Sequence, residues 1–425
     1  MINLRRIIPR PELTILAALT FVYIFEPPLI HVNAHMVIEA VAIMYILWNL
    51  IRKKGAITIE RRYVNILLNF IPFIIYETIA VFVHISAEPS NSQVFQNEFF
   101  LVFRTIIRIT IIDIAYYEYV NTHNISYEEQ LDNLKYVTFI QLFFVILTLL
   151  VPGIRSMIVN LIINNSSDDN LVSVYMRLST RRGYGLAGNL FDSFGYIMSI
   201  LFAVSFTGWL ENGKKSNLFV SLSIIFACIL NARTGVLLCV IVMVAALIFY
   251  KKSVTILKYI IATLIALPVI YTVVMSIWES YFPENFKWLS EGINEAVALI
   301  LLREYIGTFE ALHDGIFWPP NVIFGTGASP ENIAGMSTDV GYVQVIWRYG
   351  AIGTLLYLGG YIKSVLSYYS FSKNDRYKCL TITLVMIVLV YLFKIYSINN
   401  LGAHSIMIML IIYGGCLNES NKRVI

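Results

Sequence analysis

Charged residues are scarce in this sequence: only 14% of its 425 residues are Asp, Glu, Lys or Arg, whereas 58% are hydrophobic. A water-soluble domain carries about a quarter of its residues as charged side chains. The shortage excludes a soluble protein of this length. Apolar stretches recur along the whole chain, and each is long enough to cross a bilayer core of about 30 Å. The segments between them are too short to fold as a separate soluble domain of ordinary size.

Cysteine and clustered metal ligands are also scarce. No Cys-x-x-Cys or Cys/His spacing occurs, and the four cysteines all lie within apolar segments, at Cys228, Cys239, Cys379 and Cys416. These features exclude a disulfide framework and a zinc site. Asp168 and Asp169 stand alone in a polar run, so we expect no Mg²⁺ or Mn²⁺ site and no cofactor. Internal repeats are absent as well, which argues against a secondary transporter.

The apolar segments predict an all-α polytopic membrane protein that forms a single membrane domain over residues 1–425. The start, MINLRRIIPRP, is basic and lacks a small-residue cleavage site, so we interpret the first segment as a retained signal anchor. About twelve spans are predicted, at 12–32, 35–51, 63–85, 99–119, 136–152, 190–210, 218–230, 235–250, 254–277, 341–362, 379–398 and 405–417. An even number of spans places both termini on one side.

The distribution of Lys and Arg predicts which side that is. With cytoplasmic termini, inner segments hold 19 cations and outer segments hold 7, as the positive-inside rule requires. Eleven of the inner cations are lysines, whereas six of the outer seven are arginines. Lysine suffices to orient a chain, but the planar guanidinium can hold an oxyanion through two parallel hydrogen bonds. The outer arginines therefore indicate contact with an anion.

Two long outer loops are predicted, at 153–189 and 278–340. Long loops in a compact bundle are more often functional than not. The first contains RLSTRRGYGLAGN, with Arg177, Arg181 and Arg182, and its glycines are expected to let backbone and arginines approach a phosphate closely.

In the second loop, residues 293–315 predict an amphipathic helix. On such a helix Arg303, Gly307, Glu310 and Asp314 would share one polar face, while the opposite face could rest on the membrane surface. This placement would point Arg303 over a cavity mouth. A solvated face is an equally acceptable interpretation.

Three arginines fall inside predicted spans, in the outer half of the bilayer: Arg104, Arg108 and Arg348. An intramembrane charge costs at least about 2.5 kcal/mol at the helix centre and normally faces a cavity or a partner. These arginines are expected either to line one outward-opening cavity or to pair structurally, for instance with Asp113 or Glu118.

Arg233 and Asp339 lie at the predicted outer surface. Arg233 is held on the very short turn NART, residues 231–234, which makes a rigid mount. Asp339 stands where the chain enters the span at 341–362, and partial burial there would suit a general base. A helix N-cap or a first-turn charge is the alternative for Asp339.

These motifs, in this order, resemble the Wzy family of O-antigen and capsular polysaccharide polymerases, which is related to the O-antigen ligases. The resemblance is carried by RRGYGLAGN, NARTG, and a GTG loop leading through STDVGY to RYGAIG, within residues 177–356. In the family two large periplasmic loops bear an Arg-x10-Gly arrangement. Arg177 to Gly188 fits this spacing, whereas Arg303 to Gly315 has one residue too many. The ligases usually carry a histidine near the GTG loop where this chain has Asp339, which favours a polymerase.

The resemblance implies a GT-C-like membrane glycosyltransferase in the bacterial inner membrane, working without a metal at the periplasmic face. Donor and acceptor would both be oligosaccharide repeat units on undecaprenyl pyrophosphate, and a chain-length regulator could be a partner. Asp339 is expected to be the base, with His313 and His404 as alternatives. Arg233, Arg303, Arg181 and Arg182 are expected to hold the pyrophosphate, with Arg177, Arg104, Arg108 and Arg348 as second candidates.

An O-antigen ligase is the alternative within the same class, and a lipid-linked oligosaccharide flippase is the alternative from another class. A flippase should place cations in both halves of the bilayer, whereas of the cations within the predicted spans only Lys258 lies near the inner face.

Overall fold

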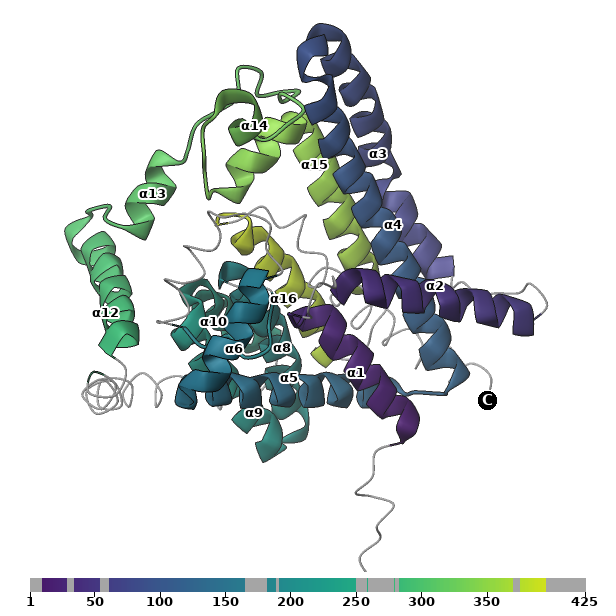
Figure 1. Ribbon diagram of the computed structural model, residues 1–425, viewed down its shortest axis with the longest axis vertical. Coiled ribbons are helices and arrows are strands. Elements are labelled where there is room, and N and C mark those ends of the chain that lie inside the picture. Colours follow the sequence, from purple (N-terminus) through teal and green to yellow (C-terminus); the bar gives the residue numbers. More distant parts are fainter. Residues whose placement is uncertain are drawn as a thin grey trace, which may run out of the picture.

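The computed structural model describes residues 10–28, 34–53, 61–164, 182–188, 191–249, 258, 279, 283–369 and 375–394 (Figure 1). Over these residues the chain is helical, and no strand occurs in them. The helices are α1 (Pro11–Phe25), α2 (Ala34–Arg52), α3 (Arg61–Ala87), η2 (Pro89–Asn91), α4 (Ser92–Thr122), α5 (Tyr127–Leu150), α6 (Pro152–Asn164), α8 (Phe191–Asn212), α9 (Lys215–Asn231), α10 (Arg233–Phe249), α12 (Pro283–Val297), η3 (Ala298–Leu302), α13 (Thr308–Asp314), α14 (Pro330–Ala334), α15 (Gly341–Tyr369) and α16 (Asp375–Tyr391).

Four helical segments in the described part of the chain are long and apolar enough to cross a membrane by length and composition. They are Ala34–Arg52, Leu68–Ala87, Tyr127–Leu150 and Phe191–Asn212, and three shorter apolar helices cover Pro11–Phe25, Lys215–Asn231 and Arg233–Ala246. These helices support a helical membrane protein, while the number of twelve spans stays a prediction. The spans predicted at 254–277, apart from Lys258, and at 405–417 lie outside the described residues.

Helix α8 is the centre of the main bundle, and almost all of its side chains are buried. It packs against α5, α9, α10 and α16 (Figure 1). Its crossing with α10 depends on two glycines, because a Cβ added to Gly195 would lie 2.9 Å from the Gly235 nitrogen. Small residues of this kind let helix backbones approach closely inside membranes. The crossing fixes the start of α10, where Arg233 stands, against the start of α8.

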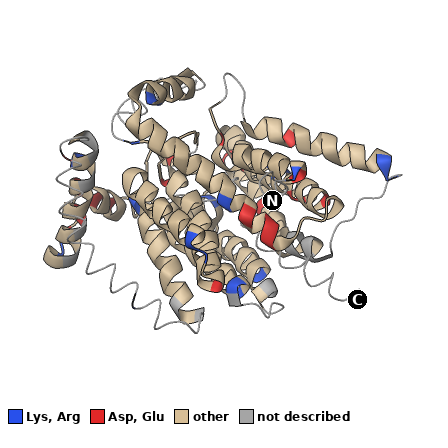
Figure 2. Ribbon diagram, turned by 90° about the horizontal axis from the view of Figure 1, so that it is seen from below, with Lys and Arg blue, Asp and Glu red and all other residues tan. Residues whose placement is uncertain are grey.

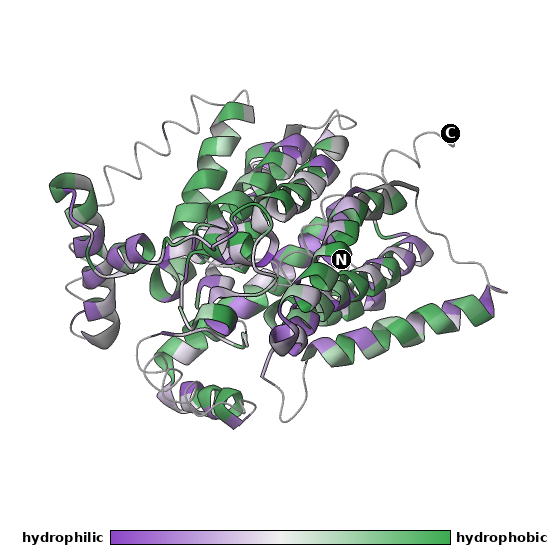
Figure 3. Ribbon diagram, turned by 90° about the horizontal axis from the view of Figure 1, so that it is seen from above, coloured by the Kyte–Doolittle hydropathy of each residue, from purple (hydrophilic) through white to green (hydrophobic). Residues whose placement is uncertain are grey.

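A second group of helices is built from α3, α4 and α15, with α2 packed against α4. In Figure 1 the α3 and α4 helices run side by side above the bundle, and the short helix α14 lies near their upper ends. Figure 3 shows that the long helices are mostly hydrophobic, whereas α12 and α13, at the left edge, carry more hydrophilic positions.

Helix α5 begins nine residues before the span predicted at 136–152. Its start is set by a capping box: the Ser126 hydroxyl accepts a hydrogen bond from the Glu129 backbone nitrogen, and the Glu129 side chain accepts one from the Ser126 nitrogen. Hydropathy does not detect this polar first turn. The extension brings Glu128 and Glu129 to the end of the bundle where other charged residues gather.

Ion pairs join the helix ends that the sequence predicts to be cytoplasmic. Arg376 of α16 is buried between Glu128 of α5 and Glu211 of α8, at 3.1 Å from each. Lys53 pairs with Glu118, and Arg10 pairs with Glu129. Figure 2, the view from below, shows blue and red positions on neighbouring helices around the N-terminus.

The continuous helix expected over 293–315 is not formed. Helix α12 ends at Val297, a π-helical turn follows, and Arg303 then adopts a left-handed conformation with φ of 58°. Gly307, also at positive φ, precedes α13. Arg303, Gly307, Glu310 and Asp314 therefore do not share one helical face, and that prediction was wrong. The apolar periodicity of residues 293–315 continues through the break at Arg303. It gives no sign of the break, because non-glycine residues rarely adopt the left-handed conformation.

The GTG loop is inserted into a kink of α15. Gly350 has φ of 64° and ψ of −178°, which interrupts the helix and frees carbonyl groups of the preceding turn. The Trp347 carbonyl accepts a hydrogen bond from the Thr326 nitrogen at 2.7 Å, and the Arg348 carbonyl accepts one from the Gly327 nitrogen at 3.1 Å. The motif RYGAIG therefore marks a docking point for the loop within the span predicted at 341–362.

Candidate anion-binding site

The loop at residues 182–188 is pinned to the NART turn by one buried side chain. Asn231, at the end of α9, accepts a hydrogen bond from the Gly183 nitrogen at 2.8 Å and donates one to the Gly183 carbonyl at 2.9 Å. The same amide donates to the Ala227 carbonyl of its own helix. Two bonds between one amide and one residue fix the loop in position and orientation. They place Arg182 beside the turn that carries Arg233.

Further contacts hold the loop against α5 and α1. The Gln141 side chain donates to the Tyr184 carbonyl at 2.6 Å, and the Gly188 nitrogen donates to the Phe25 carbonyl at 2.8 Å. A Cβ on Gly188 would lie 2.3 Å from the Glu26 carbonyl oxygen, and one on Gly185 would lie 2.9 Å from the Gln141 amide. These two glycines thus permit close approach of protein to protein, not of backbone to a phosphate as expected from the sequence.

Arg233 is the first residue of α10, and its surroundings are tied to α8. The Thr234 hydroxyl donates to the carboxylate of Asp192 in the first turn of α8. Together with the Gly195–Gly235 crossing, this bond makes the starts of both helices one rigid unit. The prediction that the NART turn is a firm mount is consistent with these contacts.

Arg182 and Arg233 converge on a single aromatic ring. Their guanidinium carbons each lie 4.4 Å from the ring centroid of Trp288 on α12. This distance is within the range in which a cation is attracted to an aromatic face. Arg182 also donates to the Tyr184 hydroxyl at 3.0 Å, and Arg233 donates to the Glu295 carboxylate at 3.3 Å. The two loops predicted to be outer and the short turn therefore meet at one place.

One face of α12 makes this contact. Trp288, Gly292 and Glu295 follow spacings of four and three, so they lie above one another on the helix surface. A Cβ on Gly292 would fall 2.0 Å from a terminal nitrogen of Arg233, so the guanidinium lies directly on the bare backbone of α12. Trp288 is only 8% exposed. In this arrangement its ring is covered by the two guanidinium groups and is not free to stack on a sugar.

The site has two guanidinium groups close together and an unused donor. Glu295 is directly bonded to Arg233, whereas Arg182 has no carboxylate bonded to it among the described residues. The Nε of Arg182 is buried and has no hydrogen-bond partner among the described residues. A buried donor left unpaired costs about 1–3 kcal/mol, so an acceptor there is stabilising. The arrangement suits an oxyanion with several oxygens, which can bind both guanidinium groups.

The other candidate arginines have different neighbours. Arg348, 9% exposed, pairs with Glu98 of α4 at 3.1 Å, and the same carboxylate accepts a bond from Asn332 of α14. Arg108 pairs with Glu39 of α2 at 3.0 Å, and Arg104 is exposed. Structural pairing, one of the two expectations, therefore describes Arg108 and Arg348. The suggested partners were wrong, because Glu118 pairs with Lys53 and the described contacts give no partner to Asp113.

The candidate bases are exposed or undescribed. The Asp339 side chain is 69% exposed and lies 3.7 Å from Lys394 of the α16 end, so the partial burial expected for it is not observed. His313 is also exposed and lies 3.2 Å from Asp314, and Arg303 is exposed. Arg177, Arg181 and His404 lie outside the described residues.

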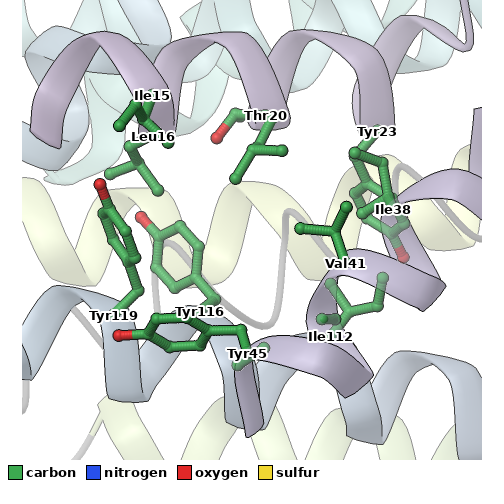
Figure 4. Close-up of a pocket in the computed structure, with 13 residues that line it drawn as sticks. Ile15, Leu16, Thr20, Tyr23, Ile38, Val41, Tyr45, Ile112, Tyr116 and Tyr119 are labelled. Carbon is green, nitrogen blue, oxygen red and sulfur yellow. The ribbon is translucent and has the colours of Figure 1, made fainter. Parts of the chain in front are cut away.

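An apolar pocket lies between α1, α2 and α4, and its lining includes none of these arginines. Figure 4 shows Tyr45, Tyr116 and Tyr119 on one side of it and residues of α1 on the other. Apart from Thr20 and Tyr23, its remaining walls are hydrocarbon, from residues such as Leu16 and Ile38. No cation lines it, so it does not fit the anion expected from the sequence.

Several residues of the candidate site escaped sequence reasoning. Neither Glu295 nor Gly292 was singled out from the sequence. The spacing of Trp288, Gly292 and Glu295 is a helical signal that could have identified the face, but no spacing within α12 predicts its contact with Arg233. Among the described residues no group of three His, Cys, Asp or Glu side chains could hold a metal ion.

Comparison with known proteins leaves the candidate site as the main basis for assigning a function. No protein-family model matches the chain, and the curated proteins contain no match to it.

Proposed function

We propose that the protein polymerises undecaprenyl-pyrophosphate-linked oligosaccharide repeat units at the outer face of the bacterial cytoplasmic membrane. It would transfer the growing glycan from its lipid pyrophosphate carrier to a hydroxyl of a new lipid-linked repeat. This is the activity of the Wzy-type polymerases that the sequence motifs resemble. The polysaccharide would be an O-antigen or a capsule.

One observation carries the proposal: Arg182 and Arg233 meet at Trp288 although they come from separate parts of the chain. The reaction releases a lipid pyrophosphate, so the site must bind an anion whose charge increases as the glycosidic bond breaks. Two preorganised guanidinium groups stabilise such a charge strongly in a partly dry site. The buried, unpaired Nε of Arg182 supports an acceptor at this position.

The candidate residues differ in the role that we propose for each. Arg233 and Arg182 would contact the pyrophosphate directly. Arg303, Arg181 and Arg177 are further candidates from the same two loops, whereas the pairing of Arg348 with Glu98 and of Arg108 with Glu39 supports structural roles for those arginines. Asp339 would accept the proton of the attacking hydroxyl, and its exposure leaves it accessible to a sugar.

The placement in the membrane belongs to the same proposal. The ion pairs among Arg376, Glu128, Glu211 and the neighbouring helix ends gather charge at the end predicted to be cytoplasmic. The candidate anion site involves the loops predicted to be periplasmic. Both termini would then be cytoplasmic, and the partners would be the lipid-linked donor and acceptor.

The test is complementation of a polymerase-null strain with Arg233→Ala, Arg182→Ala or Asp339→Asn, with membrane levels of each variant measured by immunoblot. We expect glycans of a single repeat in place of long chains. Arg52→Ala is the matched control, because Arg52 is an exposed arginine at the end of α2 and is not a candidate ligand. Long-chain glycan from Arg233→Ala at a normal protein level would contradict the proposal.

The glycans of a deletion strain distinguish the alternatives. Single repeats attached to the lipid core support a polymerase. Unattached polymer would instead indicate an O-antigen ligase, and lipid-linked intermediates that remain at the cytoplasmic face would indicate a flippase.

A further inference from the structure

We propose that α12 is a built-in cover of the arginine site, and that its Glu295 carboxylate occupies Arg233 until an anionic ligand displaces it. The inference rests on the proposed function, since it takes the arginine pair to be the pyrophosphate site. It adds that the site described here is the closed, self-occupied form and that binding requires α12 to shift.

The first argument is coverage. The ring of Trp288 lies against both guanidinium groups, and the backbone at Gly292 touches Arg233. Trp288 is buried by these contacts. A pyrophosphate that bonded to both arginines would need space on the side where α12 lies. The backbones that carry the two arginines are held by Asn231 and by the crossing of α8 with α10, so α12 is the element that moves.

The second argument is charge. Glu295 is a carboxylate bonded to Arg233 at 3.3 Å, and Glu291 lies one turn earlier on the same helix. A carboxylate and a phosphate compete for the same donors, and the phosphate offers more charge and more acceptor oxygens. Glu295 thus competes with the ligand for Arg233. A lipid pyrophosphate displaces it, whereas an anion with less charge and fewer acceptor oxygens does not.

The third argument is the construction of the segment. Besides its contacts with Arg182 and Arg233, helix α12 packs mainly against η3, α13 and α9 among the described residues. Its C-terminal side ends in a π-helical turn and the left-handed Arg303, with Gly307 also at positive φ. Apolar side chains are exposed at its last residue, Val297, and beyond it, at Leu301 and Tyr305. A helix with so few packing partners can be displaced at low cost.

The experiment measures binding of inorganic pyrophosphate to the purified full-length protein in detergent micelles by calorimetry. Glu295→Gln keeps the size of the side chain and an acceptor oxygen but removes the charge. We expect Glu295→Gln to bind pyrophosphate about fivefold more tightly than the unmodified protein, the gain expected from removing a partly exposed ion pair. Glu304→Gln, on the exposed segment after η3, is the control and should leave the affinity unchanged.

A second readout follows the cover itself. The chain has six tryptophans, so the fluorescence of Trp288 is obtained as the difference between the unmodified protein and Trp288→Phe. Pyrophosphate should make this component more accessible to acrylamide, because α12 leaves the arginines. Unchanged or reduced quenching would overturn the cover, as would an unchanged or weaker affinity of Glu295→Gln.

Failure of the cover and failure of the proposed function are distinguishable. If Arg233→Ala loses pyrophosphate binding while Glu295→Gln has the same affinity as the unmodified protein, the anion site is supported and the cover by α12 is rejected. If Arg233→Ala binds pyrophosphate as tightly as the unmodified protein, or if neither the unmodified protein nor Glu295→Gln binds it, both proposals fall.

Discussion

Asn231 and Gly183 exchange two hydrogen bonds across 48 positions of sequence. Through these bonds the end of α9 holds the loop that carries Arg182 next to the helix that begins with Arg233. The relationship turns two separate motifs, RRGYGLAGN and NARTG, into one site. It also makes Asn231 a positioning residue, since its amide is bonded to backbone and not available to a substrate.

Replacement of Asn231 by Ala should release the loop. Three hydrogen bonds of the amide are lost and buried backbone groups of Gly183 stay unpaired, so we expect a loss of about 1–3 kcal/mol in stability. Polymer formation should fall by at least tenfold. Thermal unfolding in detergent and glycan profiles check the two effects.

The control is Asn217→Ala, since Asn217 is buried near the other end of the same helix. It should lower the melting temperature yet preserve polymer formation. Equal activity losses in both variants would mean that Asn231 acts only through stability.

Replacement of Gly292 by Ala should displace the Arg233 guanidinium. The new methyl group would meet the end of a flexible side chain at 2.0 Å, and that side chain can rotate away without harm to the helix. We therefore expect reduced polymer formation with an unchanged melting temperature. Gly153→Ala, with open space around it, should change neither. Full activity of Gly292→Ala would show that the contact between α12 and Arg233 has no functional role.

Replacement of Gly350 by Ala should destabilise the fold. A Cβ at this position would lie 2.3 Å from the Ile323 carbonyl oxygen and would require a non-glycine residue at positive φ. We expect a loss of at least about 2 kcal/mol, measured by thermal unfolding. Gly359→Ala, nine residues later in the same helix and in open space, should instead be neutral or stabilising by up to about 1 kcal/mol. Similar melting temperatures for the two variants would contradict the claim that the kink requires glycine at position 350.

Removal of one partner from the buried Glu98–Arg348 pair should lower the free energy of unfolding more than removal of both. Arg348→Met leaves the Glu98 carboxylate, only 10% exposed, without its cation, and the expected loss is about 3–5 kcal/mol. The double variant Glu98→Leu with Arg348→Met should recover most of the stability in a double-mutant cycle. Polymer formation by a folded double variant would place Arg348 outside the pyrophosphate site. A folded double variant that forms no polymer would make Arg348 a candidate pyrophosphate ligand again.

Sequence reasoning predicted much of the helical framework because apolar composition and length decide where a helix can lie in a membrane. The segments predicted at 190–210 and 235–250 agree closely with α8 and α10. It missed the start of α5, since a capping box adds polar turns, and the break at Arg303, since apolar residues continue through it. The mount at Arg233 followed from loop length alone. The contacts of Trp288 and Glu295 with the arginines could not be predicted, because they join segments with no local pattern in common.

The junction between the GTG loop and α15 is made almost entirely of main-chain atoms. Amide and carbonyl groups of residues 322–327 bond to those of residues 347–352, and even the Tyr76 side chain of α3 donates to a backbone carbonyl there, that of Tyr349. The side chains of Val322, Ile323 and Phe324 point to the exterior and are exposed. Within these two segments the geometry restricts the identity of three residues, Gly325, Gly327 and Gly350, which all have positive φ and no room for a Cβ. Two proteins could thus share this main-chain junction and have little more than three glycines in common at these positions.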